Sequence, residues 1–289
     1  MKYLVVKGWL GFGDRLESLK MAVSYATKYN LKIYVDWKDS MWSHGDEDFY
    51  TYFKLLIPSL SSLDEIPADA TFHPPYWKDH IKEPLTQELL NSDKGQLGLN
   101  LGVLTKEFPA DVVVFSSIGM RTLYPDSKFF ADVFRVVEPT VLQKVRQRKQ
   151  AFPIEKSWGI HIRGTDRLKA HKRMLSVQSL VSLVVNHGAM NGPLMTVVSD
   201  DKENALVWKR FYPTSFLASE LSLQQESLAG NHNLSKDKLK FTKHELNIDM
   251  LADFFTLAST TQVFTTCRDS RFTHEARRLH PFVNTILGQ

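Results

Sequence analysis

The sequence is poor in the features that mark several large protein classes. It has one cysteine, Cys267, among 289 residues, so no disulfide can form within the chain and a reducing compartment is expected. It has no run of about 18 uninterrupted apolar residues, which a membrane-spanning helix needs. Residues 1–6 hold too few apolar side chains for a signal peptide. These absences predict a cytoplasmic protein without a transmembrane segment.

An excess of charge of either sign is also missing. The formal net charge is +4 and the isoelectric point is near 8.9, which suits a small anionic ligand but is too weak to indicate nucleic acid as a partner. Apolar residues make up 43% and charged residues 24%, as in a globular protein with a real core. At this length one large domain or two domains of about 150 residues are expected.

Clusters of metal ligands are scarce as well. The segment Asp46-Glu47-Asp48 has the D-x-D form used by metal-dependent transferases, but it lies in a polar loop and does not follow an apolar strand. His274 and His280 lack the i, i+4 spacing that places two histidines on one helix face for zinc. We therefore predict that the protein has no metal site.

What the sequence does contain is strand–helix alternation at both ends. Strand 3–6, a glycine turn, a helix from Leu16 and strand 31–35 form a βαβ unit. The alternation restarts with strands 157–162, 194–198, 215–217 and 262–265 and helices 176–186, 203–211, 246–257 and 273–279. Between the two, 140–150 is predicted to be a basic helix with solvated charges. The pattern predicts an α/β fold with Rossmann-like domains at 1–138 and 139–289.

The most informative segment ends the strand 157–162. It reads His161-Ile162-Arg163-Gly164-Thr165-Asp166, with polar residues at the carboxyl end of a strand, where open α/β sheets bind their ligands. Arg163 offers a planar fork that matches a phosphate, and His161, two residues earlier, points to the same side of the strand. A salt-bridged strand end, Arg163 with Asp166, is the alternative interpretation.

This segment resembles the first motif of the α1,6-fucosyltransferases and protein O-fucosyltransferases, which share an H-x-R-x-x-D pattern. Val198–Asp201 resembles their second motif, and 249–273 resembles their third. Near the start, Gly11–Leu16 and Asp36–Ser40 are similar to segments of the bacterial nodulation fucosyltransferases. The resemblance covers most of the chain.

That resemblance implies a GT-B architecture, in which two Rossmann-like domains face each other across a cleft. Residues 1–138 would form the acceptor side and 139–289 the side of the nucleotide-sugar donor. The implied reaction transfers fucose from GDP-fucose, with inversion, to a glycan or other hydroxyl acceptor. Neither a metal nor a separate cofactor is implied.

The resemblance also implies roles for individual residues. Arg163 would act in catalysis by holding the donor β-phosphate, with His161 beside it. Asp253 would accept hydrogen bonds from guanine, and Asp249, one helical turn earlier, shares its face. The other implied donor-binding residues are Gly11, Gly13, Asp200, Asp201, Ser270, Arg271, Phe272 and Thr273. For Asp201 and its neighbour Asp200, a helix cap for 202–211 is the alternative.

Two positions depart from the family pattern. The α1,6-enzymes carry two adjacent arginines, whereas Gly164 replaces the second one here. The carboxylate proposed as the base in related enzymes aligns near His171. His171 could act as a catalytic base at neutral pH, or it could be a surface histidine beside Lys172 and Arg173.

Two other functions remain open from the sequence. Gly11 and Gly13 after a strand, with Asp36 ending the next strand, partly match the fingerprint of NAD(P)-dependent oxidoreductases, although Leu16 replaces its third glycine. A non-catalytic nucleotide- or carbohydrate-binding protein is the other alternative. The aromatic residues of 42–77 would then form a sugar platform, or they are core residues.

Overall fold

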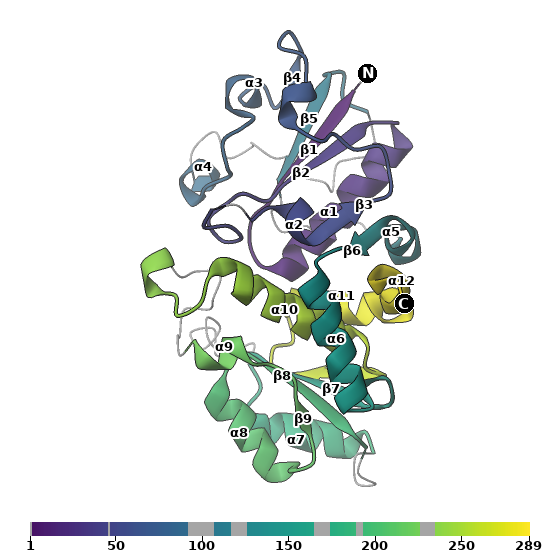
Figure 1. Ribbon diagram of the computed structural model, residues 1–289, viewed down its shortest axis with the longest axis vertical. Coiled ribbons are helices and arrows are strands. Elements are labelled where there is room, and N and C mark those ends of the chain that lie inside the picture. Colours follow the sequence, from purple (N-terminus) through teal and green to yellow (C-terminus); the bar gives the residue numbers. More distant parts are fainter. Residues whose placement is uncertain are drawn as a thin grey trace. The chain divides into compact units, whose positions relative to one another are not determined.

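The computed structural model describes residues 2–45, 47–91, 107–116, 126–164, 174–188, 193–225 and 235–289. The chain forms two compact units, Met1–Val137 with Gly288 and Glu138–Leu287 with Gln289. Each unit contains its own parallel sheet (Figure 1). Among the described residues, no helix is long and apolar enough to cross a membrane.

The first unit is built on a sheet with the strand order β2-β1-β5-β4, in which all neighbouring strands are parallel. Its strands are β1 (Tyr3–Lys7), β2 (Lys32–Asp36), β4 (Phe72–His73) and β5 (Val112–Ser116). A separate antiparallel pair joins β3 (Phe53–Leu55) to β6 (Phe134–Val136). The helices are α1 (Phe12–Lys28), α2 (Phe49–Tyr52), α3 (Trp77–His80), α4 (Gln87–Asn91) and α5 (Ser127–Val133).

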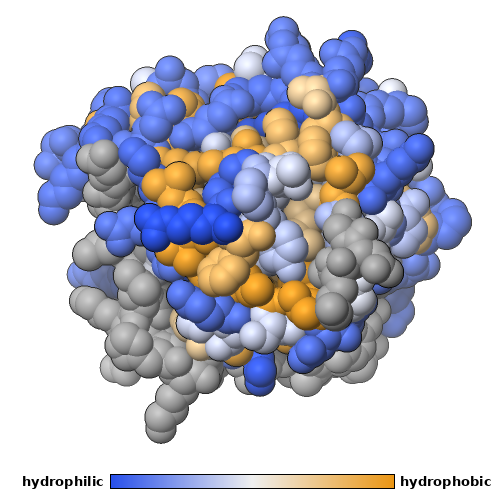
Figure 2. Space-filling model, turned by 90° about the horizontal axis from the view of Figure 1, so that it is seen from below, coloured by the Kyte–Doolittle hydropathy of each residue, from blue (hydrophilic) through white to orange (hydrophobic). Residues whose placement is uncertain are grey.

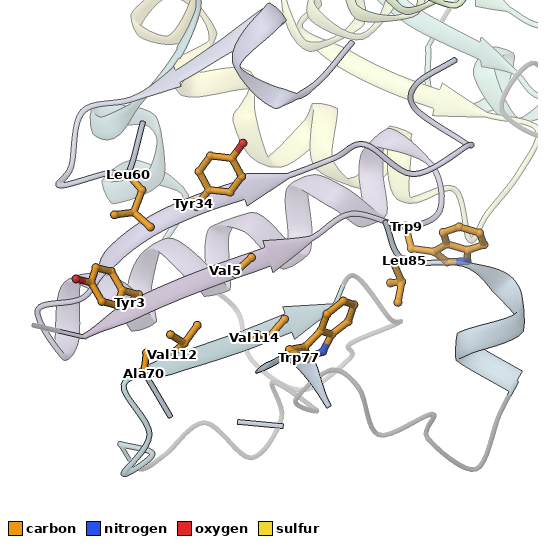
Figure 3. Close-up of a cluster of buried hydrophobic side chains, with 10 residues drawn as sticks. All are labelled: Tyr3, Val5, Trp9, Tyr34, Leu60, Ala70, Trp77, Leu85, Val112 and Val114. Atoms are coloured by element: carbon orange, nitrogen blue, oxygen red, sulfur yellow. The ribbon is translucent and has the colours of Figure 1, made fainter. Parts of the chain in front are cut away.

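Both faces of β1 are buried, as its continuous apolar run predicts. Figure 3 shows the core on one face of this sheet. It is formed by Tyr3, Val5, Trp9, Tyr34, Leu60, Ala70, Trp77, Leu85, Val112 and Val114. Alternate residues of β1 and β5 take part, because successive side chains of a strand point to opposite faces.

Helix α1 starts earlier than the sequence predicts. It begins at Phe12, with Gly11 as its N-cap, so Gly13 lies inside the first turn and not in a loop before Leu16. The apolar face of the helix explains the difference, because Phe12, Gly13 and Leu16 are all buried. Burial outweighs the low helix propensity of glycine.

The segments 11–16 and 36–40 meet in a buried ion pair. Nη1 and Nη2 of Arg15 donate to Oδ2 and Oδ1 of Asp39 at 2.8 and 2.7 Å, and Nε of Arg15 donates to the carbonyl of Leu10. A Cβ atom at Gly8 would lie 2.1 Å from Nη1 of Arg15 and 2.5 Å from Cδ1 of Trp37. Only glycine therefore fits at position 8, directly after β1 and beside this ion pair.

The second unit is built on a sheet with the order β10-β7-β8-β9, again with all neighbours parallel. Its strands are β7 (Trp158–Ile162), β8 (Met195–Ser199), β9 (Phe216–Leu217) and β10 (Gln262–Thr265). The helices are α6 (Pro139–Ala151), α7 (Val177–Asn186), α8 (Lys202–Phe211), α9 (Leu221–Gln224), α10 (Lys243–Ala258), α11 (Arg271–Leu279) and α12 (Val283–Leu287). The predicted α/β fold, with a Rossmann-like sheet in each half of the chain, is confirmed.

Helices α7 and α8 pack on the second sheet through an apolar core. The core combines residues of β7, β8 and β10 with Val177, Leu180 and Val184 of α7 and Trp208 of α8. Figure 2 views the second unit from the side of these helices and shows an apolar patch framed by hydrophilic side chains. The polar residues of the predicted site lie elsewhere, at the carboxyl ends of the strands.

Candidate functional site

The polar residues that the sequence singles out lie at the carboxyl ends of neighbouring strands in the second sheet. Arg163 and Gly164 follow β7, Asp200 and Asp201 follow β8, and residues 266–270 follow β10. Because β10, β7 and β8 are parallel neighbours, these ends meet at one edge, where open α/β sheets bind ligands. This edge is the candidate site.

Arg163 is oriented from two sides. Its Nη1 lies 2.9 Å from Oδ2 of Asp200, and its backbone N–H donates to Oγ1 of Thr266 at 2.9 Å. The Arg163 side chain is 23% exposed. Asp166, the partner considered from the sequence, lies outside the described residues. Among the described residues, Asp200 is a carboxylate that orients Arg163.

The neighbours of Gly164 explain why a glycine stands at this position. Its N–H donates to Oδ1 of Asp200 at 2.8 Å, and a Cβ atom would lie 2.1 Å from Oδ2 and 2.4 Å from Cβ of Asp201. Asp201 in turn caps α8 by accepting from the N–H of Asn204 at 2.9 Å. The cap interpretation of Asp201 is thus confirmed, and it leaves no room for a second arginine beside Arg163. Whether Asp200 and Asp201 contact a donor stays a prediction.

His161 is buried between β7 and α11. Its Nδ1 lies 2.7 Å from Oγ1 of Thr273 and 3.4 Å from Oγ1 of Thr265, and its ring centroid lies 5.2 Å from that of Phe272. Burial lowers the pKa of His161 to about 4, and Asp200 opposes this only in part. The imidazole is therefore neutral at physiological pH and joins the strand to the start of the helix.

This burial predicts an acid-sensitive stability. Between the ordinary pKa of 6.5 and the folded value of about 4, the unfolded chain binds a proton at His161 that the folded chain does not. The contribution of His161 to the free energy of unfolding is present in full above about pH 6.5 and is lost as the pH falls to about 4. At about 1.4 kcal/mol per pKa unit, it amounts to about 3 kcal/mol. Melting temperatures of the wild type and His161→Asn should converge as the pH falls.

The comparison of the wild type with His161→Asn is needed because Asp253 also makes the stability depend on pH. Its pKa is raised from 3.8 to about 7, so it favours the folded state as the pH falls and opposes the effect of His161. The difference between wild type and His161→Asn removes the contribution of Asp253, because both proteins contain it. A difference in melting temperature that is constant with pH would contradict the assignment.

The N-terminus of α11 also lies at the candidate site. Ser270 is its N-cap, and its Oγ accepts from the N–H of Thr273 at 3.3 Å. Phe272 packs against His161 and Phe254, and both Phe272 and Arg271 are partly exposed. The His161–Thr273 contact places this helix start beside β7. A helix N-terminus presents backbone N–H groups and a partial positive charge, which favour an anion.

Asp249 and Asp253 lie one turn apart on α10, and both are buried. Oδ2 of Asp249 accepts from the N–H groups of Leu221 and Ser222 at 2.9 and 3.2 Å. Oδ2 of Asp253 accepts from Oγ of Ser219 at 2.5 Å. Both carboxylates therefore hold the segment 218–222 that follows β9, and a contact with guanine stays a prediction.

Arg148 is a residue of this region that the sequence interpretation missed. The basic helix 140–150 was expected to carry solvated charges, yet the Arg148 side chain is 4% exposed and its Nη1 lies 3.0 Å from Oδ1 of Asp253. Lys144, one turn earlier, lies 3.5 Å from Oδ1 of Asp249. The available signal was two basic residues at i, i+4 on one helix and two acidic residues at i, i+4 on another.

The remaining predicted residues belong to the first unit or fall outside the described residues. His171 and residues 165–167 fall outside the described residues, as does Asp46. Gly11 and Gly13 lie at the start of α1 in the first unit, and Asp48 caps α2. In the described part of the chain, no three His, Cys, Asp or Glu side chains are grouped so that they could hold a metal ion.

The fold is similar to those of solved fucosyltransferases. Fucosyltransferase NodZ from Bradyrhizobium matches with a TM-score of 0.67 at 16% identity, over 96% of this chain and 93% of NodZ. NodZ alpha-1,6-fucosyltransferase soaked with GDP-fucose matches with a TM-score of 0.68 at 17% identity, over 97% and 94% of the two chains. POFUT1 in complex with GDP matches with a TM-score of 0.53 at 12% identity, over 99% and 97%.

The likeness to these fucosyltransferases is found by comparing structures and not by comparing whole sequences. No protein-family model and no curated protein sequence matches the chain. The likeness is therefore one of fold, and it confirms the fold that the resemblance of the sequence motifs implied. The chain has the GT-B fold of NodZ and POFUT1 over nearly its whole length.

Proposed function

We propose that the chain transfers fucose from GDP-fucose to a hydroxyl group of an acceptor, with inversion at the anomeric carbon. The observation that carries the proposal is the guanidinium of Arg163, which Asp200 orients at the same sheet edge as the start of α11. An arginine fork and a helix N-terminus both favour a phosphate. The fold shared with NodZ, a structure soaked with GDP-fucose, supports this choice of donor.

The leaving group in this reaction is GDP. The acceptor oxygen attacks C1 of fucose from the face opposite the phosphate, the electrons of the C1–O bond pass to the β-phosphate, and the acceptor proton passes to a base. Arg163 and the N–H groups near Ser270 are preorganised to stabilise the growing phosphate charge. His171 is the candidate base from the sequence.

Asp253 is proposed to select the base of the donor. Guanine presents N1–H and N2–H₂ side by side, which suits a carboxylate, whereas uracil presents one N–H between two carbonyl groups. GDP is therefore expected to bind and UDP is not. At about 100 times its dissociation constant, GDP should stabilise the protein by about 2.7 kcal/mol in a thermal-shift panel that also contains GDP-fucose, GDP-mannose, UDP-sugars and NAD(H).

Asp253→Asn tests that assignment. It keeps the shape of the side chain but replaces one acceptor with a donor, so GDP should bind about 10-fold to 100-fold more weakly, as expected for losing a hydrogen bond to a charged group. Asp237→Asn is the matched control, because Asp237 is exposed in the same unit. If Asp253→Asn binds GDP as tightly as the control, Asp253 does not read the base.

Turnover of GDP-fucose is expected to continue in EDTA, with no separate cofactor. The reason is that Arg163 and the start of α11 supply the positive charge that a metal ion supplies in other transferases. GDP release is measured with and without the chelator. Loss of turnover that Mn²⁺ restores would contradict this expectation and point to the segment 46–48.

An NAD(P)-dependent oxidoreductase is disfavoured by the first unit. Asp36, which would have to bind the ribose hydroxyls, is buried, and its Oδ2 lies 2.5 Å from Nζ of Lys7. Leu16, at the position of the third glycine, is fully buried. Saturable binding of NADH in a fluorescence titration would reverse this conclusion.

A non-catalytic binding protein is disfavoured by the aromatic residues of the first unit. Trp42, Phe49, Tyr52, Phe53 and Trp77 are buried, so they form core and not an exposed sugar platform. Release of GDP from GDP-fucose separates an enzyme from a binding protein.

The setting is proposed to be the cytoplasm, with a glycan or another hydroxyl compound as the acceptor and no nucleic acid as a partner. The chain has a single cysteine, Cys267, which is buried, and a chain with one cysteine suits a reducing compartment. The net charge of +4 is too small to favour nucleic acid.

A further inference from the structure

Four charged side chains connect α6 to α10, and we call them the charge ladder. Lys144 and Arg148 lie one turn apart on α6, opposite Asp249 and Asp253 on α10. Nζ of Lys144 lies 3.5 Å from Oδ1 of Asp249, and Nη2 of Arg148 lies 3.7 Å from the same atom. Nη1 of Arg148 lies 3.0 Å from Oδ1 of Asp253. Because Arg148 and both carboxylates are almost fully buried, water screens these interactions little.

The charge ladder is attached to the candidate site. Asp249 accepts from the backbone at Leu221 and Ser222, and Asp253 accepts from Oγ of Ser219. Oγ of Ser219 in turn accepts from the N–H of Ser199, the last residue of β8, at 2.8 Å. The ladder therefore reaches from α6 to the sheet edge where Asp200 and Arg163 lie.

We propose that Arg148 is a positioning residue for base recognition: it holds Oδ1 of Asp253 so that the carboxylate presents its remaining lone pairs to guanine. A carboxylate has about four acceptor sites. Ser219 donates to Oδ2. The guanidinium of Arg148 lies 3.0 Å from Oδ1 as an ion pair, and Oδ1 has no hydrogen-bond partner among the described residues. These two contacts limit the rotation of the group and leave an acceptor without a hydrogen bond. The proposal rests on the proposed function, because it takes GDP as the ligand.

Charge gives Arg148 a second effect on the same atom. Burial raises the pKa of Asp253 to about 7, and Arg148 acts against that rise while Asp249 adds to it. Lys144 of the ladder also forms an ion pair with Glu220, after β9, at 2.5 Å. On α11, which packs against α10, the buried Glu275 forms an ion pair with Arg278 at 2.8 Å. Loss of Arg148 would leave Asp253 protonated to a higher pH. A protonated carboxyl offers a donor where guanine also has donors.

Three variants test the proposal through the ratio of the dissociation constants of UDP and GDP, measured by competition between about pH 6 and about pH 8. The ratio removes the titration of the phosphates, which both nucleotides share. Arg148→Met should lower the preference for GDP about 10-fold, as removal of a supporting side chain does at other sites. It should also raise the pH at which the GDP preference is half developed, which is its pH midpoint. Arg148→Lys, which keeps the charge but not the fork, should keep the midpoint and lose part of the preference. Arg146→Met, at an exposed position of α6, should change neither.

The outcomes separate this proposal from the proposed function. A wild type that does not prefer GDP to UDP overturns both. A wild type that prefers GDP, with a preference and a pH midpoint unchanged in Arg148→Met, overturns the positioning role alone, even if the melting temperature falls. Should Arg148→Met fail to fold, Arg148→Lys decides, because an unchanged GDP preference in that variant also overturns the role.

Discussion

Alanine at Arg163 is expected to lower kcat for fucosyl transfer by about 10²–10³, with a much smaller effect on binding of GDP-fucose. Asp200 holds the guanidinium at 2.9 Å and the Arg163 side chain is 23% exposed, so in the proposed mechanism it is preorganised to stabilise the charge that grows on the departing phosphate. A group that acts mainly on the transition state changes kcat more than the dissociation constant. Single-turnover release of GDP and a binding titration on the same variant measure both.

Arg163→Lys separates charge from geometry. An ammonium keeps the positive charge but lacks the two-pronged fork, so only part of the lost rate should return. Arg210→Ala, at an exposed position of α8, is the control for removing an arginine from the second unit. If Arg163→Ala has a normal kcat and a lowered melting temperature, Arg163 only ties the end of β7 to Asp200.

The edge of the second sheet could be predicted from the sequence because its signals are local. The apolar run of β7 stops where His161 and Arg163 begin, and the same change from apolar to polar ends β8 at Asp200. Parallel neighbours then bring these ends together without further information. The strand pattern predicts that Arg163 and Asp200 both follow strands, but their contact depends on the strand order of the structure, and the sequence had suggested Asp166 as the partner of Arg163.

Arg148 could not be placed in this way, because its partner Asp253 is distant in the sequence and on another helix. In a helix with several basic residues, solvation is the ordinary outcome for each of them. Only the packing of α6 against α10 selects Arg148 for burial. The need for glycine at position 164 also depends on a residue distant in the sequence, Asp201, whose position is set by its role as the N-cap of α8.

Loss of one partner from the Arg15–Asp39 pair is expected to destabilise the first unit strongly. Both side chains are at most 1% exposed, and Arg15 lies 5.4 and 5.2 Å from the ring centroids of Trp37 and Trp42. Asp39→Ala would leave the guanidinium buried without its counter-charge, which costs about 3–5 kcal/mol. Chemical unfolding of the first unit, followed through its tryptophans, measures the change.

The surface pair Lys128–Asp132 supplies the control within the same unit. Its side chains are 68% and 52% exposed, so Asp132→Ala should change the free energy of unfolding by less than about 1 kcal/mol. A double variant, Arg15→Met with Asp39→Leu, removes both buried charges and should be less destabilised than the sum of its single changes. Additive effects, or an Asp39→Ala variant no less stable than Asp132→Ala, would contradict the pair's role.

Arg15 also holds the carbonyl of Leu10, which has a left-handed φ of 66°. Asp39→Ala should therefore loosen the turn that leads to Gly11 and Gly13, and proteolysis within residues 8–13 should increase before the unit unfolds.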